Sequence, residues 1–123
     1  MRKQYFFRES QRGLLAWDVD RLVALTKDLP RRWVPLAQVR ELDAPWAGDG
    51  EPVTWRSFVQ HVRLMDDVDL AFPIILAADG TVMDGMHRIV QALRIGRAEI
   101  EAVQFEIDPE PDYIGVGPDA LPY

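Results

Sequence analysis

Five consecutive residues in the second half of the chain combine groups that bind anions and move protons: Asp84, Gly85, Met86, His87 and Arg88. An arginine side chain grips two oxygens of a phosphate at once, a glycine lets a ligand approach the backbone, and a histidine changes charge near neutral pH. If a helix begins here, its first backbone N–H groups also favour a negative charge. The pattern therefore indicates a phosphate site.

The neighbouring residues predict the elements that position this segment. The apolar run from Ile74 to Leu76 is too short for a helix, and it is followed by the turn signal Asp79-Gly80 and a second short apolar run. This order predicts a strand, a turn and a strand. Apolar residues then recur at helical spacing, so we expect a helix from about Gly85 to Ile95, ended by Gly96. Asp84 is the expected N-cap of that helix, accepting a hydrogen bond from an N–H of the first turn.

The charges in this first turn allow two interpretations. His87 and Arg88 place a potential and a permanent cation at the positive end of a helix dipole, which costs roughly 0.3–1 kcal/mol per charge. A bound anion would compensate that cost. Alternatively, Arg88 pairs with Asp84 four residues earlier and His87 lies half-buried against the sheet. The local sequence leaves both interpretations open.

In this setting the sequence resembles the nucleotide-binding core shared by the ParB/sulfiredoxin superfamily, which includes the ParB N-terminal domain, the sulfiredoxins and the free-serine kinases. The resemblance spans roughly residues 34–107: a strand, the motif Asp-Gly-Met-His-Arg, a helix, a glycine and a strand beginning near Ile100. Free-serine kinases carry the similar motif Asp-Gly-His-His-Arg. Sulfiredoxins carry Gly-Gly-Cys-His-Arg, and their cysteine would fall on Met86. Because the chain has no cysteine, sulfinic-acid reductase activity is excluded.

The resemblance implies a mixed α/β fold: one domain over residues 1–123, with a small mixed sheet flanked by helices and residues 108–123 as an extended tail. It also implies binding of ATP or another nucleoside triphosphate, such as CTP, with Mg²⁺. The amides of Gly85, Met86 and His87 and the side chain of Arg88 would hold phosphate oxygens. His87 would also stabilise developing charge, and Asp84 would orient a metal ion or an acceptor hydroxyl.

Catalysis would need a base as well. In free-serine kinases a glutamate after the strand that enters the cleft serves as the base, and Glu41 is the nearest candidate in this chain. The first hypothesis is therefore a phosphotransferase or phosphohydrolase acting on a nucleotide and a small hydroxyl-bearing substrate. The second is a nucleotide-gated binding module, in which the nucleotide sets a conformation or a homodimer. The third is a degenerate core that serves only as an interaction protein.

Composition narrows the class of protein. The chain has 123 residues, 48% of them hydrophobic, which suits one globular domain. Its formal charge is −6 and its basic residues are scattered, which weighs against DNA binding. No run approaches the roughly 20 apolar residues of a membrane span, and the first residues lack the apolar region of a signal peptide. We therefore expect a cytoplasmic protein without a membrane segment.

Further patterns predict two more helices. Asp18 is placed to cap a helix that Pro30 stops, and Thr54 to cap a second one. We expect the apolar stripe of the second helix to belong to the core, with His61 beside it at the surface and without a role. The stripe consists of Trp55, Phe58, Val59, Val62 and Met65. The acids Asp66, Asp67 and Asp69 fit a solvated turn better than a cation site.

The remaining segments predict strands and loops. Residues 34–39 and 102–107 are expected strands, the second half-buried with Val103, Phe105 and Ile107 on its inner face. Residues 41–51, which include Trp46, form an acidic loop with the composition of a lid. Residues 4–7 are compatible with a strand or a packed arm. The tail is too rich in proline and glycine for regular structure, yet its apolar residues indicate that it wraps the domain or mediates a dimer.

Overall fold

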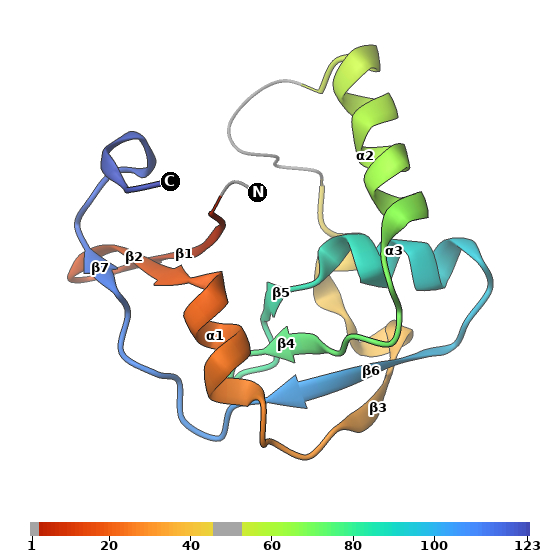
Figure 1. Ribbon diagram of the computed structural model, residues 1–123, viewed down its shortest axis with the longest axis horizontal. Coiled ribbons are helices and arrows are strands. Elements are labelled where there is room, and N and C mark those ends of the chain that lie inside the picture. The colour runs from red at the N-terminus through yellow and green to blue at the C-terminus, as the bar shows by residue number, and fades with distance from the viewer. Residues whose placement is uncertain (1–2, 46–52) are drawn as a thin grey trace.

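The computed structural model describes residues 3–45 and 53–123. It has the expected mixed α/β architecture, with three α-helices and two small sheets in the described residues (Figure 1). None of the helices in these residues has the length and apolar character needed to cross a membrane. The elements, in chain order, are β1 (Tyr5–Ser10), β2 (Gly13–Asp18), α1 (Val19–Thr26), β3 (Arg32–Pro35), α2 (Trp55–Asp67), β4 (Ile74–Leu76), β5 (Val82–Asp84), α3 (Met86–Arg94), β6 (Glu99–Gln104) and β7 (Tyr113–Ile114).

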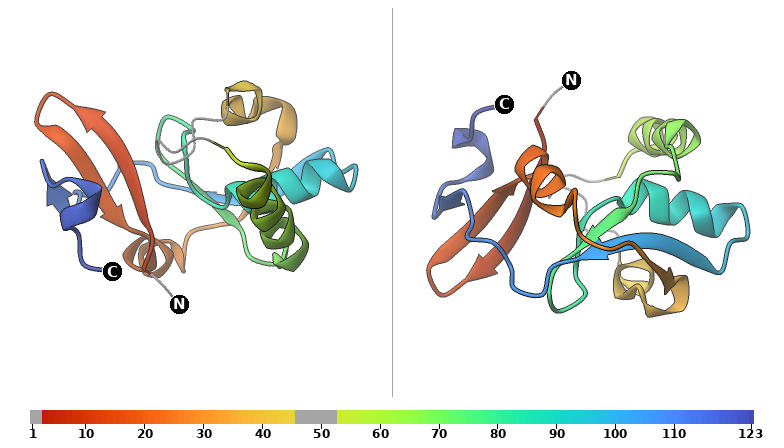
Figure 2. Two further views of the ribbon diagram at one scale, coloured as in Figure 1. Left: turned by 90° about the horizontal axis from the view of Figure 1, so that it is seen from above. Right: turned by 60° about the horizontal axis from the view of Figure 1, so that its bottom comes forward.

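The larger sheet has the strand order β3-β6-β4-β5. Strand β6 lies antiparallel to β3 and parallel to β4, and β4 and β5 form the expected strand-turn-strand unit, with a register shift between Ile75 and Leu76. The smaller sheet, β1-β2-β7, is antiparallel. Figure 2 shows this smaller sheet set apart from the larger one, with α1 beside it.

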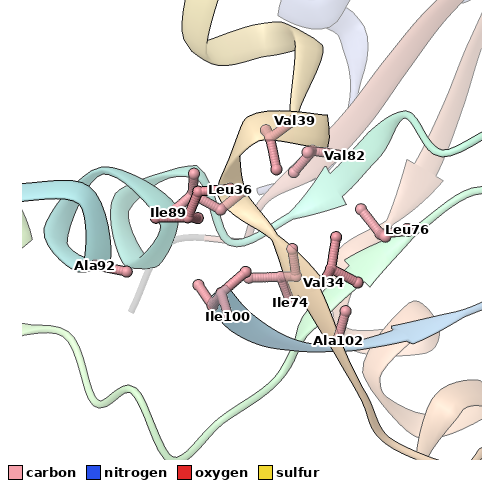
Figure 3. Packing of buried hydrophobic residues seen from close by; sticks show 10 residues of the cluster. All are labelled: Val34, Leu36, Val39, Ile74, Leu76, Val82, Ile89, Ala92, Ile100 and Ala102. Atoms are coloured by element: carbon pink, nitrogen blue, oxygen red, sulfur yellow. The ribbon is translucent and has the colours of Figure 1, made fainter. Parts of the chain in front are cut away.

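Two apolar clusters cover the two faces of the larger sheet, because successive side chains of a strand point to opposite sides. Ile74 and Ala102 belong to one cluster, which α3 covers with Ile89 (Figure 3). Ile75 and Val103 belong to the other, which is completed from the smaller sheet and α1. The central strands β4 and β6 are therefore buried on both faces, and they fix the start of α3 on a rigid base.

The expected half-buried strand at residues 102–107 was wrong in its bounds and its burial. Strand β6 runs from Glu99 to Gln104 and is covered on both faces, because Ala102 belongs to one apolar cluster and Val103 to the other. Ile107 lies beyond the strand and is 84% exposed. The strand expected at residues 34–39 ends at Pro35, where the chain turns into a 3₁₀ helix that begins at Leu36.

The helix predictions were right about position and partly wrong about burial. Asp18 caps α1 and Thr54 caps α2, and the latter forms a reciprocal capping box with Ser57. The apolar stripe of α2 is not core, however: Met65 is the only buried residue of the helix, and Trp55 is 88% exposed. The cap organises α2, but little of its apolar surface finds a partner among the described residues.

The two ends of the described chain meet in the smaller sheet. Residues 4–7, left undecided by the sequence, enter a hairpin whose second strand, β2, was not expected. The tail packs on the domain as expected, and it also supplies the short strand β7: Gly115 donates to Leu14 O over 2.8 Å, and Trp17 Nε1 donates to Pro109 O over 2.8 Å. The tail therefore completes a sheet on the side away from α2 and α3 (Figure 1).

Candidate functional site

The start of α3 depends on one glycine. Gly85, not Asp84 as expected, is the N-cap, with φ 110° and ψ 20°, a conformation that L side chains rarely adopt. A Cβ at this position would lie 2.7 Å from Ile74 Cγ2 and 2.9 Å from Arg88 Nη2. No side chain caps the first turn of α3, so its backbone N–H groups have no capping acceptor from the described residues. Backbone conformation and space both require glycine here.

Arg88 forms an ion pair with Asp84, four residues earlier, which was the alternative to a bound anion that the sequence left open. Its Nη2 donates to Asp84 Oδ2 over 3.0 Å and to Pro73 O over 3.4 Å. The two charged side chains are 19% and 21% exposed. The Arg88 Nε is buried without a hydrogen-bond partner among the described residues. Asp84 therefore does not cap the helix, and it holds the guanidinium of Arg88 in place instead.

Asp84 and Arg88 lie in the wall of a cavity of about 290 Å³. The cavity is bounded by the end of α1 and the segment before β4, and Ile75 and Val103 contribute apolar surface. Lys27 and Arg31 add two further cations. Arg31 is engaged by Glu101 at 2.8 Å, whereas Lys27 makes no ion pair within the described residues. The wall thus combines three cations, one carboxylate and an apolar floor.

The sequence offered no signal for the contribution of Lys27 and Arg31. They follow α1 on either side of Pro30 and are more than fifty residues before Arg88. Only the packing of α1 beside β4 brings them to the same cavity. A sequence pattern identifies the residues of one helix start, but it does not identify what the fold places opposite.

His87 faces a different direction from Arg88. Its Nε2 lies 3.0 Å from Nδ1 of His61 on α2, and His61, which we expected at the surface, is half-buried. Burial lowers the pKa of His87, the nearby His61 lowers it further, and the negative charge of Asp84 opposes both effects. A neutral imidazole is therefore favoured at pH 7.

Glu41 lies in a 3₁₀ turn at residues 40–43 and contacts the backbone of β5. Its Oε2 accepts a hydrogen bond from Val82 N over 2.6 Å, and its Oε1 is buried without a partner among the described residues. The neighbouring Leu42 packs against the α3-side cluster, which is the apolar cluster that contains Ile74 and Ile89. No interaction within the described residues joins Glu41 to Asp84 or His87.

Two of the three acids near the end of α2 have polar partners. Asp66 pairs with Arg94, and Asp69 Oδ1 accepts from Ala71 N over 2.9 Å. Within residues 3–45 and 53–123, no group of three or more His, Asp or Glu side chains is placed to hold a metal ion. Met86 packs its side chain against the α3-side cluster, which leaves its amide as its only candidate ligand. Trp46 and most of the expected acidic lid lie outside the described residues.

The arrangement is suited to binding a small molecule that carries both an anion and an apolar group. Arg88 supplies N–H donors and positive charge to the cavity wall, and Ile75 and Val103 supply apolar surface. Comparison of the chain with models of protein families, with curated proteins and with solved structures found no match.

Proposed function

We propose that this protein binds a phosphorylated small molecule, with nucleotides as the first class to test, at the start of α3. The support comes from one observation: Arg88, in the first turn of a helix whose start has no side-chain cap among the described residues, lies in the wall of a cavity and is held there by Asp84. A guanidinium positioned before the ligand arrives loses less side-chain entropy on binding. The apolar floor would accept the base, and Arg88 with the first amides of α3 would hold phosphate oxygens.

Mg²⁺ fits this site only together with a nucleotide. Asp84 is the single carboxylate that the described residues place in the cavity wall, and its Oδ2 is already used by Arg88. Mg²⁺ prefers octahedral oxygen coordination and is commonly held by one or two carboxylates together with substrate phosphates and water. When bound, it would neutralise phosphate charge. Asp84 would then supply its remaining oxygen, with the phosphates supplying other ligands.

Binding without turnover is favoured over phosphoryl transfer by the placement of the expected catalytic groups. Glu41 contacts the β5 backbone and His87 contacts α2, so neither lies with Asp84 in the cavity wall. Phosphoryl transfer remains the second candidate because Asp84 lies in the cavity wall, where its carboxylate would orient an acceptor hydroxyl. Release of phosphate from bound ATP or CTP at catalytic rates would favour this second candidate.

The test is isothermal titration with ATP, ADP, CTP and inorganic pyrophosphate, with and without Mg²⁺. Arg88→Ala should weaken binding roughly ten- to a hundredfold, as expected for the loss of a hydrogen bond to a charged group worth about 1.5–3 kcal/mol. Arg94→Ala is the matched control. It removes an arginine from the same helix that is also paired with an aspartate, Asp66, but does not line the cavity. It should bind like the unchanged protein.

Two results would contradict the proposal. One is binding that Arg88→Ala and Arg94→Ala reduce equally, and the other is no binding of any of these phosphates. Circular dichroism on both variants checks that they fold. If Arg88→Ala is unfolded, Arg88→Lys replaces it: the charge is kept, the two-pronged geometry is lost, and affinity should still fall.

A further inference from the structure

The chain has two histidines, and the fold brings them together from different helices. Nδ1 of His61 on α2 and Nε2 of His87 on α3 lie 3.0 Å apart. The ring centroids are 5.2 Å apart and the planes differ by 20°. The centroid separation exceeds the nitrogen separation by about the width of one imidazole ring. Both nitrogens therefore lie close to the line between the rings, which meet edge to edge in an in-plane N–H···N hydrogen bond.

This hydrogen bond is one of two polar links between α2 and α3 that the described residues show. Met65 is the only buried residue of α2, and the apolar side chains Trp55, Phe58 and Val59 are exposed. The second polar link between the two helices, Asp66 with Arg94, is a solvent-exposed pair and so contributes little. Figures 1 and 2 show α2 crossing over α3 at the outside of the domain. Of the two polar links, the histidine pair is therefore the one whose loss on protonation we expect to loosen α2.

We propose that the His61–His87 hydrogen bond is a proton-sensitive latch that holds α2 against α3 and opens when both rings are protonated. We assign His61 Nδ1–H as the donor and His87 Nε2 as the acceptor. The pair can take up one proton and keep the bond, because one hydrogen then still lies between the two facing nitrogens. A second proton must bind Nε2 of His87, after which both facing nitrogens carry hydrogen and both rings are positive.

The surroundings of His87 agree with this assignment. Burial is the main cause of its lowered pKa, and His61 adds to it, so His87 is the ring that stays unprotonated and accepts. Asp84 on β5 opposes the lowering, and its charge is shared with Arg88 on α3. Because the pKa of His87 is depressed in the folded protein, the latch is closed above about pH 6.5 and opens as the pH falls below that value. The latch does not depend on the ligand proposed above.

The test combines two measurements on the full chain. Ring ¹⁵N spectra from pH 8 to 4 contain only two histidines, and they should show two separated, coupled titration steps with His87 as the Nδ1–H tautomer. Hydrogen exchange, corrected for the intrinsic pH effect, should show α2 amides losing severalfold in protection between pH 7.5 and 5.5. The amides of β6 should keep theirs.

His61→Gln separates the latch from a merely structural contact. A glutamine amide can donate N–H to a neutral His87 or present its oxygen to a protonated one, so α2 should stay protected and lose its pH dependence. His61→Leu should reduce the protection of α2 at both pH values. Independent titration of the two rings in the unchanged protein would overturn the proposal. So would α2 protection that does not change with pH, or that changes equally in the unchanged protein and His61→Gln.

Discussion

Substituting the glycine at the start of α3 should damage both the fold and the position of Arg88. In Gly85→Ala, alanine must adopt φ 110°, a left-handed conformation that costs an L residue roughly 1–2 kcal/mol. The new Cβ would also lie 2.7 Å from Ile74 Cγ2, closer than real contacts allow, and Ile74 is fully buried in the core. Overpacking of this kind costs typically 1–3 kcal/mol. We expect a total loss of about 2–5 kcal/mol.

Gly96 at the other end of α3 provides a matched control. It has φ 83° and completes a Schellman motif, in which Gly96 donates to Leu93 O and Arg97 to Ala92 O over 3.0 and 2.9 Å. A Cβ there would meet nothing within 4 Å. Gly96→Ala therefore carries the cost of the backbone conformation alone, about 1–2 kcal/mol. The difference between the two variants isolates the contact with Ile74 and Arg88.

Urea unfolding of both variants measures this difference directly. Gly85→Ala should be less stable than Gly96→Ala by about 1–3 kcal/mol, with unchanged slope. It should also weaken phosphate binding, because the new Cβ would lie 2.9 Å from Arg88 Nη2 and displace the guanidinium from Asp84. Equal stability of the two variants would show that Gly85 is needed only for its backbone angle. That result would remove the argument that it positions Arg88.

Two further predictions address α2 and the N-terminal hairpin. In urea unfolding, Trp55→Ala should change the free energy of unfolding by less than about 0.5 kcal/mol, whereas Met65→Ala should lower it by about 2–3 kcal/mol. A larger effect at Trp55 would show that the apolar stripe of α2 is part of the core. The pKa of Asp18 is lowered chiefly by the hydrogen bond from Lys3, and the N–H of Asp20 lowers it further. The ionised carboxylate therefore stabilises the fold fully above about pH 4, and this stabilisation is lost as the pH falls further. Between pH 5 and 2, the free energy of unfolding should therefore fall less in Asp18→Asn than in the unchanged protein. Identical pH profiles would argue against this role of Asp18.

Local signals predicted the elements that depend on local chemistry. The caps Asp18 and Thr54, the turn at Asp79-Gly80 and the glycine stop at Gly96 each bond within a few residues, so their effect is visible in a short window. The mixed α/β class followed from these elements and from the resemblance. Bounds were less accurate where a strand passes into a 3₁₀ turn, as after Pro35.

Burial was harder to predict because it depends on which elements become neighbours. The stripe of α2 has the spacing of a core-facing helix, yet Trp55 stays exposed because the described residues place no element over it. Strand β6 alternates like a half-buried strand, yet it is central because β3 and β4 pair with its two edges. The meeting of His61 with His87 had no sequence signal for the same reason: 26 residues separate them.

The five-residue motif serves three surfaces rather than one. Consecutive residues of an α-helix project about 100° apart, so three side chains in a row point in three directions. Met86 turns into the core, His87 toward α2 and Arg88 toward the cavity. A ligand that contacts both Arg88 and His87 would therefore have to lie over the end of the α3 axis, where the uncapped N–H groups point. A ligand held deeper in the cavity would use Arg88 and leave His87 to α2. The same short segment thus connects a proposed phosphate site with a proposed latch through one turn of helix.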